Sequence, residues 1–386
     1  MMLHALPRRL IQTFALAGAA LLAACTTTPP APPPEAEAPV MRGKEPNYKR
    51  VTVHFGTNRA EGDGSDPARA FGTQFSSQVS YGSAEVSIPR DHRMGELEGP
   101  NPWLLEFRQD PEKHVVLMSV SKMDRQHFLD EISAEVNDAG SRHALVFVHG
   151  YNTGFADAAR RTAQISYDIG FLGVPLFYSW PSQDSLLGYA QDEDAVARSQ
   201  PLMREFFRDL AERLDVNTIY VIAHSMGTRA TAGALADLFT ERPDLRDRFR
   251  QIMLMAPDID AKVFRTQIAP ALVQPDSRVT LYASSNDLAL KASRTVHQAG
   301  RLGDASPLIV LPGMDSIDAS DVATDLLGHS YYADGDSVVA DIIEVISDKG
   351  PPDNRTWLEA LRGDHGRFFR FKPLSAVLPQ SRAATP

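Results

Sequence analysis

From residue 144 onward, short continuous runs of apolar residues alternate with longer stretches in which apolar residues recur at helical spacing. Continuous apolar runs are typical of parallel strands that are buried on both faces of a sheet. The pattern therefore predicts an α/β fold, with a mostly parallel central sheet and helices on both of its faces. The expected strands are 144–148, 174–179, 218–223, 251–256, 278–283 and one within 307–319, and the expected helices lie near 155–169, 194–214, 226–241 and 337–347.

The region before this alternation has a different pattern. Strand-like runs at 50–55, 84–88 and 114–120 are separated by turns rich in glycine and proline, and a helical pattern follows at 123–138. We therefore expect a strand-rich N-terminal extension of the fold, and its position leads us to expect that it borders the functional site. The resulting boundaries are 48–142 for the strand-rich part, 143–350 for the α/β core and 351–386 for a C-terminal extension without an assigned role.

The first 25 residues have the order of features found in a secretory signal. Arg8 and Arg9 precede an apolar stretch that is too short for a membrane span, which needs about 20 apolar residues. The stretch ends in Leu-Ala-Ala-Cys at residues 22–25, which resembles the lipobox of bacterial lipoproteins. We expect 1–25 to be a signal peptide that ends at a lipidated Cys25. The alternative is an ordinary signal peptide with an incidental cysteine.

Residues 26–47 begin with a segment rich in proline, alanine and threonine. Such a segment stays extended and does not pack into a core, so it is suited to be a tether. By the same resemblance, Thr26 after the cysteine fits sorting to an outer membrane. We expect a protein of the cell envelope that faces the periplasm and is anchored to the membrane by lipid alone.

Composition narrows the classes of partner and cofactor. The 386 residues carry a formal net charge of -10, which argues against nucleic acid as a partner. Cys25 is the one cysteine, so neither an intramolecular disulfide nor a cysteine-rich zinc site is possible. We expect no metal and no organic cofactor.

The segment from Ala223 to Gly227, Ala-His-Ser-Met-Gly, follows an apolar strand directly and precedes a helical pattern. A Gly-x-Ser-x-Gly elbow requires this setting, because the serine occupies a sharp strand-to-helix turn that exposes its hydroxyl group. The turn demands small residues two positions before and after the serine. Gly227 satisfies this demand, and Ala223 has the next smallest side chain. Ser225 is therefore the candidate nucleophile.

Chain order limits the candidates for the general base. In the fold that contains this elbow, the acid and then the histidine follow the serine, with the histidine beyond the last strand. His297 precedes that strand in a helix-like stretch, and His365 lies in the C-terminal extension. His329 lies in a loop-like segment after the strand and before the 337–347 helix. We expect His329 to be the base.

Two aspartates compete for the role of the acid. Asp287 follows strand 278–283, which is the usual position of the acid in this fold. Asp258 lies one strand earlier, after Pro257, where a turn or helix-capping role is expected. We favour Asp287, and Asp258 remains the alternative.

An oxyanion hole requires two backbone N–H groups that point at the developing negative charge. Met226 follows the nucleophile, at the positive end of the next helix. The second candidate donor is Tyr151, in the loop after strand 144–148. His149 and His224 are expected to be structural. Trp180, with the Leu186–Leu187–Tyr189 segment, is either a wall of an acyl pocket or buried packing.

Several short motifs occur in order over about residues 48–347. They are Phe55-Gly56-Thr57-Asn58-Arg59, Val86-Ser87-Ile88-Pro89, His92-Arg93-Met94-Gly95, Val148-His149-Gly150-Tyr151-Asn152, Ser179-Trp180-Pro181-Ser182, His224-Ser225-Met226-Gly227, Ala256-Pro257-Asp258 and His329-Ser330-Tyr331. In this set the chain resembles a bacterial family of α/β-hydrolases of unknown function, described as esterase- and lipase-like. The resemblance implies the α/β-hydrolase fold and a triad of Ser225, Asp287 and His329, and it implies no particular substrate.

These features predict a serine hydrolase, of the carboxylesterase or lipase type, that cleaves a small-molecule or lipid ester or a thioester through an acyl-enzyme. One alternative is a catalytically silent envelope protein that uses the same fold for binding. A binding protein has no need of a complete Ser, acid and His set, which favours the enzyme. The other alternative, a serine peptidase, shares the triad.

Overall fold

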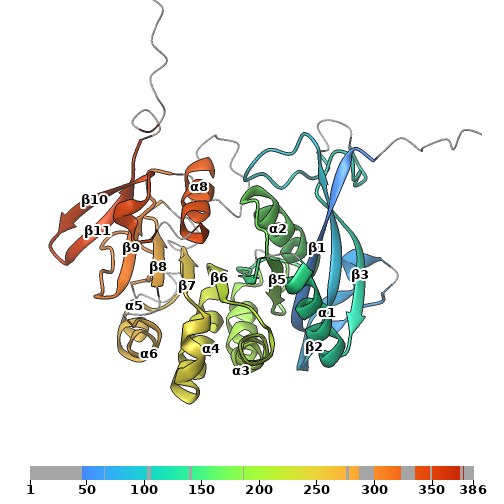
Figure 1. Ribbon diagram of the computed structural model, residues 1–386, viewed down its shortest axis with the longest axis horizontal. Helices are drawn as coiled ribbons and strands as arrows, with labels where there is room; N and C mark the ends of the chain where they lie inside the picture. Colours follow the sequence, from blue (N-terminus) through green and yellow to red (C-terminus); the bar gives the residue numbers. More distant parts are fainter. Residues whose placement is uncertain are drawn as a thin grey trace, which may run out of the picture. The chain divides into compact units, whose positions relative to one another are not determined.

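An eleven-stranded sheet is the centre of the described part of the chain in this computed structural model (Figure 1). The structure describes residues 46–64, 66–101, 106–138, 141–185, 187–274, 278–286, 300–322, 335–347, 350–373 and 377. The sheet order is β10-β11-β9-β8-β7-β6-β4-β5-β1-β2-β3. Its strands are β1 (Tyr48–Glu61), β2 (Phe71–Pro89), β3 (Val116–Met123), β4 (His143–Val148), β5 (Val174–Ser179), β6 (Thr218–His224), β7 (Gln251–Met255), β8 (Arg278–Ala283), β9 (Met314–Asp318), β10 (Leu358–Gly363) and β11 (Gly366–Phe371).

Parallel pairing runs through the middle of the sheet. β6 pairs in parallel with β4 and β7, and β8 pairs in parallel with β7 and β9. Only β2 and β10 run against the common direction among the described strands. The predicted α/β fold with a mostly parallel sheet is confirmed. The predicted strands from 144 to 283 agree with β4 to β8 to within a residue at each end, because these strands are continuous apolar runs.

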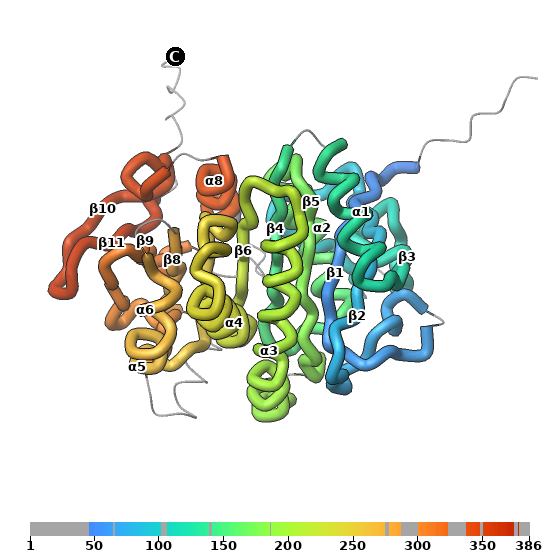
Figure 2. Tube along the Cα trace, turned by 60° about the horizontal axis from the view of Figure 1, so that its bottom comes forward, coloured from blue at the N-terminus to red at the C-terminus, as the bar shows by residue number. Residues whose placement is uncertain are grey.

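Helices cover both faces of the sheet, and each face has its own hydrophobic core (Figure 2). One core packs α1, α3, α4 and α6 against the sheet, and the other packs α2 and α8 against the opposite face. The helices are α1 (Arg125–Asp138), α2 (Phe155–Asp168), α3 (Tyr189–Arg213), α4 (Gly227–Glu241), α5 (Ala261–Val263), α6 (Ala269–Leu272) and α8 (Gly335–Ile346). Short helical turns lie at η1 (Pro67–Arg69), η3 (Pro243–Arg248), η4 (Phe264–Ile268) and η5 (Pro352–Asn354).

The helix α3 begins at Tyr189, earlier than the predicted start at 194. Its first turn is polar and therefore has no apolar periodicity to indicate a helix. The turn is fixed by Asp192, which accepts hydrogen bonds from the Ser182 hydroxyl (2.6 Å) and the Gln183 backbone N–H (2.7 Å). A buried polar contact thus sets a helix boundary that the hydrophobic pattern does not show.

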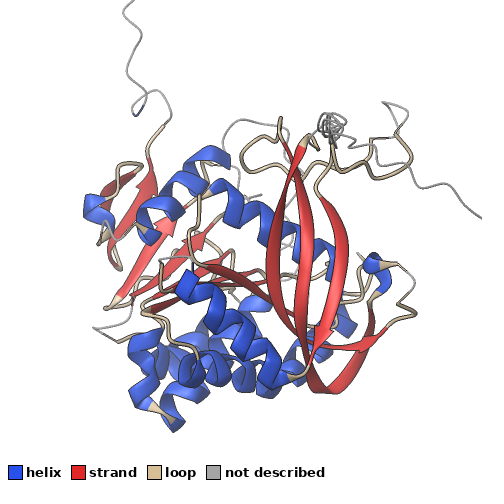
Figure 3. Ribbon diagram, turned by 45° about the vertical axis from the view of Figure 1, so that its right-hand side comes forward, coloured by secondary structure: helices blue, strands red, loops and turns tan. Residues whose placement is uncertain are grey.

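The N-terminal strands belong to the same sheet as the α/β core. β1 pairs in parallel with β5, and β2 and β3 follow as antiparallel neighbours. Figure 3 brings this side of the sheet forward and shows the long strands. Phe55 of β1 packs edge-on against Phe71 of β2 and Phe155 of α2, with ring centroids 5.4 and 5.0 Å away. The predicted strand-rich N-terminal region is confirmed.

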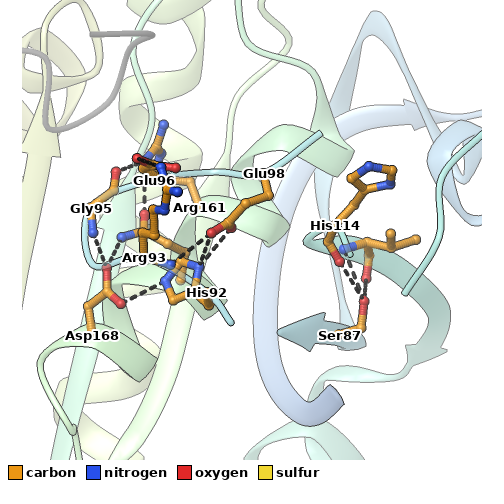
Figure 4. Close-up of polar contacts among 11 residues, drawn as sticks. Ser87, His92, Arg93, Gly95, Glu96, Glu98, His114, Arg161 and Asp168 are labelled. Atoms are coloured by element: carbon orange, nitrogen blue, oxygen red, sulfur yellow. Dashed lines mark hydrogen bonds and ion pairs between the residues drawn. The ribbon is translucent and has the colours of Figure 1, made fainter. Parts of the chain in front are cut away.

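The loop after β2 is attached to the end of α2 by a buried histidine (Figure 4). His92 contacts Glu98 through Nδ1 (2.7 Å) and Asp168 of α2 through Nε2 (2.8 Å). Asp168 also accepts the N–H of Gly95 at 2.7 Å. Burial on its own lowers the pKa of His92, but the hydrogen bonds to Asp168 and Glu98 outweigh it and raise the pKa to about 9. His92 is therefore an imidazolium held between two carboxylates at neutral pH.

The C-terminal residues extend the sheet on its other side. β10 and β11 form an antiparallel hairpin, and β11 pairs in parallel with β9. The 351–386 extension had no assigned role from the sequence. Just before the hairpin, Arg355 donates to Asp341 of α8 at 2.9 Å, and Asp341 also accepts from the hydroxyl of Tyr282 of β8 at 2.7 Å. These contacts fix α8 against β8.

None of the helices in the described ranges combines the length and the apolar character that a bilayer crossing requires. Cys25 and the expected signal peptide lie outside the described residues.

Candidate active site

Ser225 lies in a strained turn between β6, which ends at His224, and α4, which begins at Gly227. Its φ is 48°, a left-handed conformation that is unusual for a residue with a side chain. The N–H of Ser225 donates to the carbonyl oxygen of Met255 in the neighbouring strand at 2.9 Å. The strand–turn–helix setting expected for a nucleophile elbow is present, and the strain is held by the strand on one side and the helix on the other.

The small residues around Ser225 are required by the backbone that lies next to them. A Cβ atom on Gly227 would lie 2.1 Å from the carbonyl oxygen of His149. Ala223 is fully buried in the core between the sheet and the α3 and α4 helices. Both positions flanking the elbow therefore have no room for a larger side chain.

The loop after β4 passes directly beside the serine. A Cβ atom on Gly150 would lie 3.1 Å from Cβ of Ser225 and 2.8 Å from Nδ1 of His224. Tyr151 follows in this loop, and Met226 is the N-cap residue of α4, with no side-chain cap on that helix. The two predicted oxyanion donors, Tyr151 and Met226, thus come from the two segments that flank Ser225.

His149 and His224 are uncharged at neutral pH. Burial, with the nearby Arg59 cation, lowers the pKa of His149 to about 3. Burial, with the nearby Arg161 cation, lowers the pKa of His224 to about 3. The Trp180 ring is stacked on the His149 ring at 5.0 Å, and its Nε1–H donates to the His149 carbonyl oxygen at 2.9 Å. Trp180 is fully buried, so it is packing under the loop rather than a pocket wall.

Of the other residues considered for an acyl pocket, Leu187 is 93% exposed and Leu186 lies outside the described residues. The ring of Tyr189 packs edge-on against that of Tyr151, with centroids 5.7 Å apart. Both residues were candidates for separate roles in the sequence, and their ring contact joins the loop after β4 to the start of α3.

Asp258 is engaged by three side chains beneath the elbow. Its Oδ2 accepts from the Tyr189 hydroxyl (2.6 Å) and from Arg229 (2.9 Å), and its Oδ1 is paired with Arg301 at 3.2 Å. The side chain of Asp258 is only 3% exposed. Its carboxylate is therefore the counter-charge of a buried cluster that connects α3, α4 and the loop after β7.

The N-terminal strands reach the loop after β4 through Arg59 of β1, as their expected position beside the site implied. Its guanidinium donates to the carbonyl oxygen of Thr153 at 2.7 Å and lies 3.5 Å from Nε2 of His149. Arg59 belongs to the Phe55-Gly56-Thr57-Asn58-Arg59 motif, but its residue type and position in the chain predict no role for it. β1 also contains Lys49, Arg50 and His54, so no local charge pattern distinguishes Arg59 in the sequence.

Asp287 and His329 lie outside the described residues, as does His297. β8 ends at Ala283, two places from β6 in the sheet with β7 between them, and α8 begins at Gly335. His365 lies in the turn that leads into β11. Because β11 runs parallel to β9, this turn is at the sheet edge opposite the C-terminal end of β6, away from Ser225. In the described ranges, no group of three or more His, Cys, Asp or Glu residues is arranged to bind a metal ion.

A serine elbow at the carboxyl end of a parallel strand, in a sheet covered by helices on both faces, defines an α/β-hydrolase fold. The chain belongs to the family described as "Alpha/beta hydrolase of unknown function (DUF900)", which matches residues 124–348, more than half of its length. No curated protein matches the chain.

Solved structures that match this chain include two esterases. One is a fungal esterase from Rhizomucor miehei, 10% identical, with 78% of this chain and 84% of that chain covered and a TM-score of 0.34. The other is an esterase from Pyrobaculum calidifontis, 13% identical, with 65% of this chain and 99% of that chain covered and a TM-score of 0.30.

Proposed function

We propose that the protein is a serine hydrolase that cleaves a carboxylic ester or thioester. The observation that carries the proposal is the left-handed conformation of Ser225, at φ 48°, between a parallel strand and the start of α4. Such strain at a non-glycine residue is typical of functional sites, because the surrounding structure must maintain it. Such a turn presents the serine hydroxyl at the end of the strand, and Ser225 itself is 8% exposed.

In the proposed reaction, His329 takes the proton of the Ser225 hydroxyl as its oxygen attacks the acyl carbon. Asp287 orients His329 and stabilises the imidazolium that forms. The N–H groups of Tyr151 and Met226 stabilise the oxyanion of the tetrahedral intermediate. The imidazolium then protonates the departing alcohol or thiol, which leaves an acyl group on Ser225. A water molecule, deprotonated by His329, attacks this acyl-enzyme. The acyl–oxygen bond breaks, the carboxylic acid leaves, and His329 returns the proton to Oγ of Ser225.

Two features of the described residues support these assignments. Gly150 lies so near Ser225 that a Cβ atom added to the glycine would be 3.1 Å from the serine's Cβ, and an oxyanion donor next to Gly150 requires such proximity. Asp258, the alternative acid, already has both carboxylate oxygens engaged by Arg229, Arg301 and Tyr189. A carboxylate committed to two cations is poorly suited to orient a histidine, which favours Asp287.

The test is turnover of p-nitrophenyl esters of increasing acyl length by the purified protein, with Ser225→Ala beside it. Ser77→Ala, at an exposed serine of β2, is the matched control. We expect the wild type and Ser77→Ala to turn over short esters and Ser225→Ala to lose the activity. Equal rates in all three proteins would reject Ser225 as the nucleophile.

A fluorophosphonate probe distinguishes the enzyme from a silent binding protein. The proposal expects the probe to label Ser225 in the folded wild type and not in Ser225→Ala. Absence of labelling would favour the binding protein. Cleavage of peptides faster than esters by the labelled protein would favour the peptidase.

We further propose that Cys25 is lipidated and anchors the enzyme to the outer membrane, facing the periplasm. The order of charged, apolar and small residues before Cys25 supports this location. Full-length protein produced in a bacterium fed an alkyne-tagged fatty acid is expected to carry the tag and to sediment with membranes. Cys25→Ser is expected to lose both properties, and retention of the tag by that variant would contradict the anchor.

A further inference from the structure

Arg59 is a buried cation, 1% exposed, near the end of β1. All five of its N–H donors have an acceptor, which is the full capacity of a guanidinium. The acceptors are Oγ of Ser179 (2.8 Å), the carbonyl oxygens of Gly72 (3.1 Å), Ser182 (3.1 Å) and Thr153 (2.7 Å), and Nε2 of His149 (3.5 Å). Asp184, Asp192 and Asp157 act on this cation electrostatically, whereas the five acceptors of its hydrogen bonds are all neutral groups.

Burial lowers the pKa of Arg59 to about 10, against the opposing effect of Asp184 and Asp192, so the group stays charged at neutral pH. Removal of a charge from water is unfavourable unless its lost hydrogen bonds to water are replaced. Most of the replacements here come from the loop after β4 and from the segment after β5. Arg59 therefore fixes those two segments relative to each other.

The hydrogen bonds around His149 define its tautomer. Nδ1 lies 2.7 Å from the carbonyl oxygen of Gly150, so it carries the proton and donates. Nε2 of this neutral ring is then the acceptor, with the Ser179 hydroxyl at 3.2 Å and Arg59 at 3.5 Å. Since Oγ of Ser179 accepts from Nε of Arg59, its own proton is available for His149. The result is a directed chain from Arg59 through Ser179 and His149 to Gly150.

The last bond of this chain determines where the Tyr151 N–H points. The carbonyl of Gly150 and the N–H of Tyr151 belong to one planar trans peptide, in which the two groups point in opposite directions. Because the carbonyl oxygen is turned toward the His149 ring, the N–H is turned away from it. Gly150 itself lies against Ser225, with the glycine's Cβ position 3.1 Å from the serine's Cβ.

We propose that Arg59 is a positioning residue for the oxyanion hole: through Ser179 and His149 it fixes the Gly150–Tyr151 peptide in the orientation that presents the Tyr151 N–H as a donor. The hydrogen bond from Arg59 to the carbonyl oxygen of Thr153 fixes the far end of the loop after β4. The inference rests on the proposed function, in which Ser225 is the nucleophile and Tyr151 supplies an oxyanion donor.

The test compares Arg59→Met, which keeps the length and apolar bulk of the side chain, with His149→Phe, which keeps a ring to stack on Trp180. Arg50→Met is the matched control, since Arg50 lies on the same strand with a side chain that is 56% exposed. For each full-length variant, kcat and KM for a p-nitrophenyl ester are measured, together with the inhibition constant of a trifluoromethyl ketone. The ketone adduct of Ser225 carries an oxyanion. Circular dichroism melting establishes which variants are folded.

We expect kcat to fall about 100- to 1000-fold in Arg59→Met and His149→Phe, with KM changed less than about threefold. The trifluoromethyl ketone should bind more weakly in proportion to kcat, and Arg50→Met should match the wild type. If Arg59 only stabilised the fold, its replacement would lower the melting temperature, and ketone affinity would not fall in proportion to kcat. Should Arg59→Met fail to fold, His149→Phe and Ser179→Ala give the same test with the cation in place.

Wild-type kcat in folded Arg59→Met, or in His149→Phe and Ser179→Ala, would overturn the inference while the proposed function stands. Failure of the fluorophosphonate probe to label wild-type Ser225 would instead reject the proposed function, and this inference with it.

Discussion

Gly227 at the start of α4 lies so close to His149 that a Cβ atom added to the glycine would be 2.1 Å from the histidine's carbonyl oxygen. The turn at Ser225 and the loop after β4 are therefore packed backbone against backbone. The same carbonyl oxygen accepts a hydrogen bond from Trp180, which limits how far it can move to relieve a contact.

Replacement of Gly227 by alanine is expected to destabilise the protein by about 1–3 kcal/mol, because the backbone must shift to admit the methyl group. Activity should fall as well, since the shift separates Ser225 from the loop. Urea unfolding and ester turnover measure the two effects. The matched control is Gly99→Ala, where an added Cβ meets nothing within 4 Å. Equal unfolding free energies in the two variants would contradict the packing argument.

The two candidate acids are expected to respond differently to amide substitution. Asp287→Asn should lower kcat on the order of 10⁴-fold with little change in melting temperature, as expected for the residue that sets the tautomer of the base. Asp258→Asn should destabilise the fold by about 3–5 kcal/mol, because Arg229 and Arg301 lose their buried counter-charge. If folded Asp258→Asn lost turnover and Asp287→Asn kept it, Asp258 would be the acid.

The His92 contacts predict a loss of stability in mild alkali. The pKa of His92 is raised from 6.5 to about 9, so the folded state holds the proton more tightly than the unfolded chain. The stabilisation is complete below pH 6.5 and is lost as the pH rises through 9. This difference in the pKa of His92 between the unfolded and folded states corresponds to at most about 3 kcal/mol of the free energy of unfolding.

Urea unfolding of the wild type between pH 6 and about 10 measures this loss of stability. In His92→Gln the free energy of unfolding should depend less on pH over the same range. His127→Gln, at a histidine whose side chain is 66% exposed, serves as the control and should keep the wild-type slope. Identical pH curves for wild type and His92→Gln would rule out His92 as the origin.

Arg355 and Asp341 are expected to be strongly coupled. Both side chains are fully buried and are 2.9 Å apart. Arg355→Met leaves the Asp341 carboxylate without its cation and should cost about 3–5 kcal/mol. The double variant Arg355→Met with Asp341→Leu removes both charges and should recover a large part of that loss. A double-mutant cycle from chemical denaturation gives the coupling free energy, and simple additivity would contradict a buried ion pair.

The sequence predicted the middle of the sheet well because its strands are buried on both faces. Each of β4 to β8 is a continuous apolar run, and β6 leads straight into the elbow. The hairpin of β10 and β11 was missed for the opposite reason. β10 is at the edge of the sheet and alternates little, with most of its residues at least partly exposed, so neither a buried run nor a clear period of two marks it.

The elbow could be predicted because its residues are adjacent in the chain. The hydrogen bonds that hold the loop after β4 in place could not be predicted in this way. Arg59, His149 and Ser179 come from three separate strand ends and meet through hydrogen bonds that no local pattern records. The ion pair between Asp258 and Arg301 likewise joins residues that are far apart in the chain, so no local pattern predicts it.

The position of Arg59 also determines how short a fragment of this protein can be while it keeps the contacts around Ser225. The family match begins at residue 124, yet the guanidinium that spans the loop beside Ser225 belongs to β1, at Tyr48–Glu61. A fragment cut to residues 124–348 would retain the elbow and lose β1, the partner strand of β5. The region matched by the family therefore begins later in the chain than the region whose hydrogen bonds support the loop beside Ser225. A shortened or transplanted form of this hydrolase should start before Tyr48.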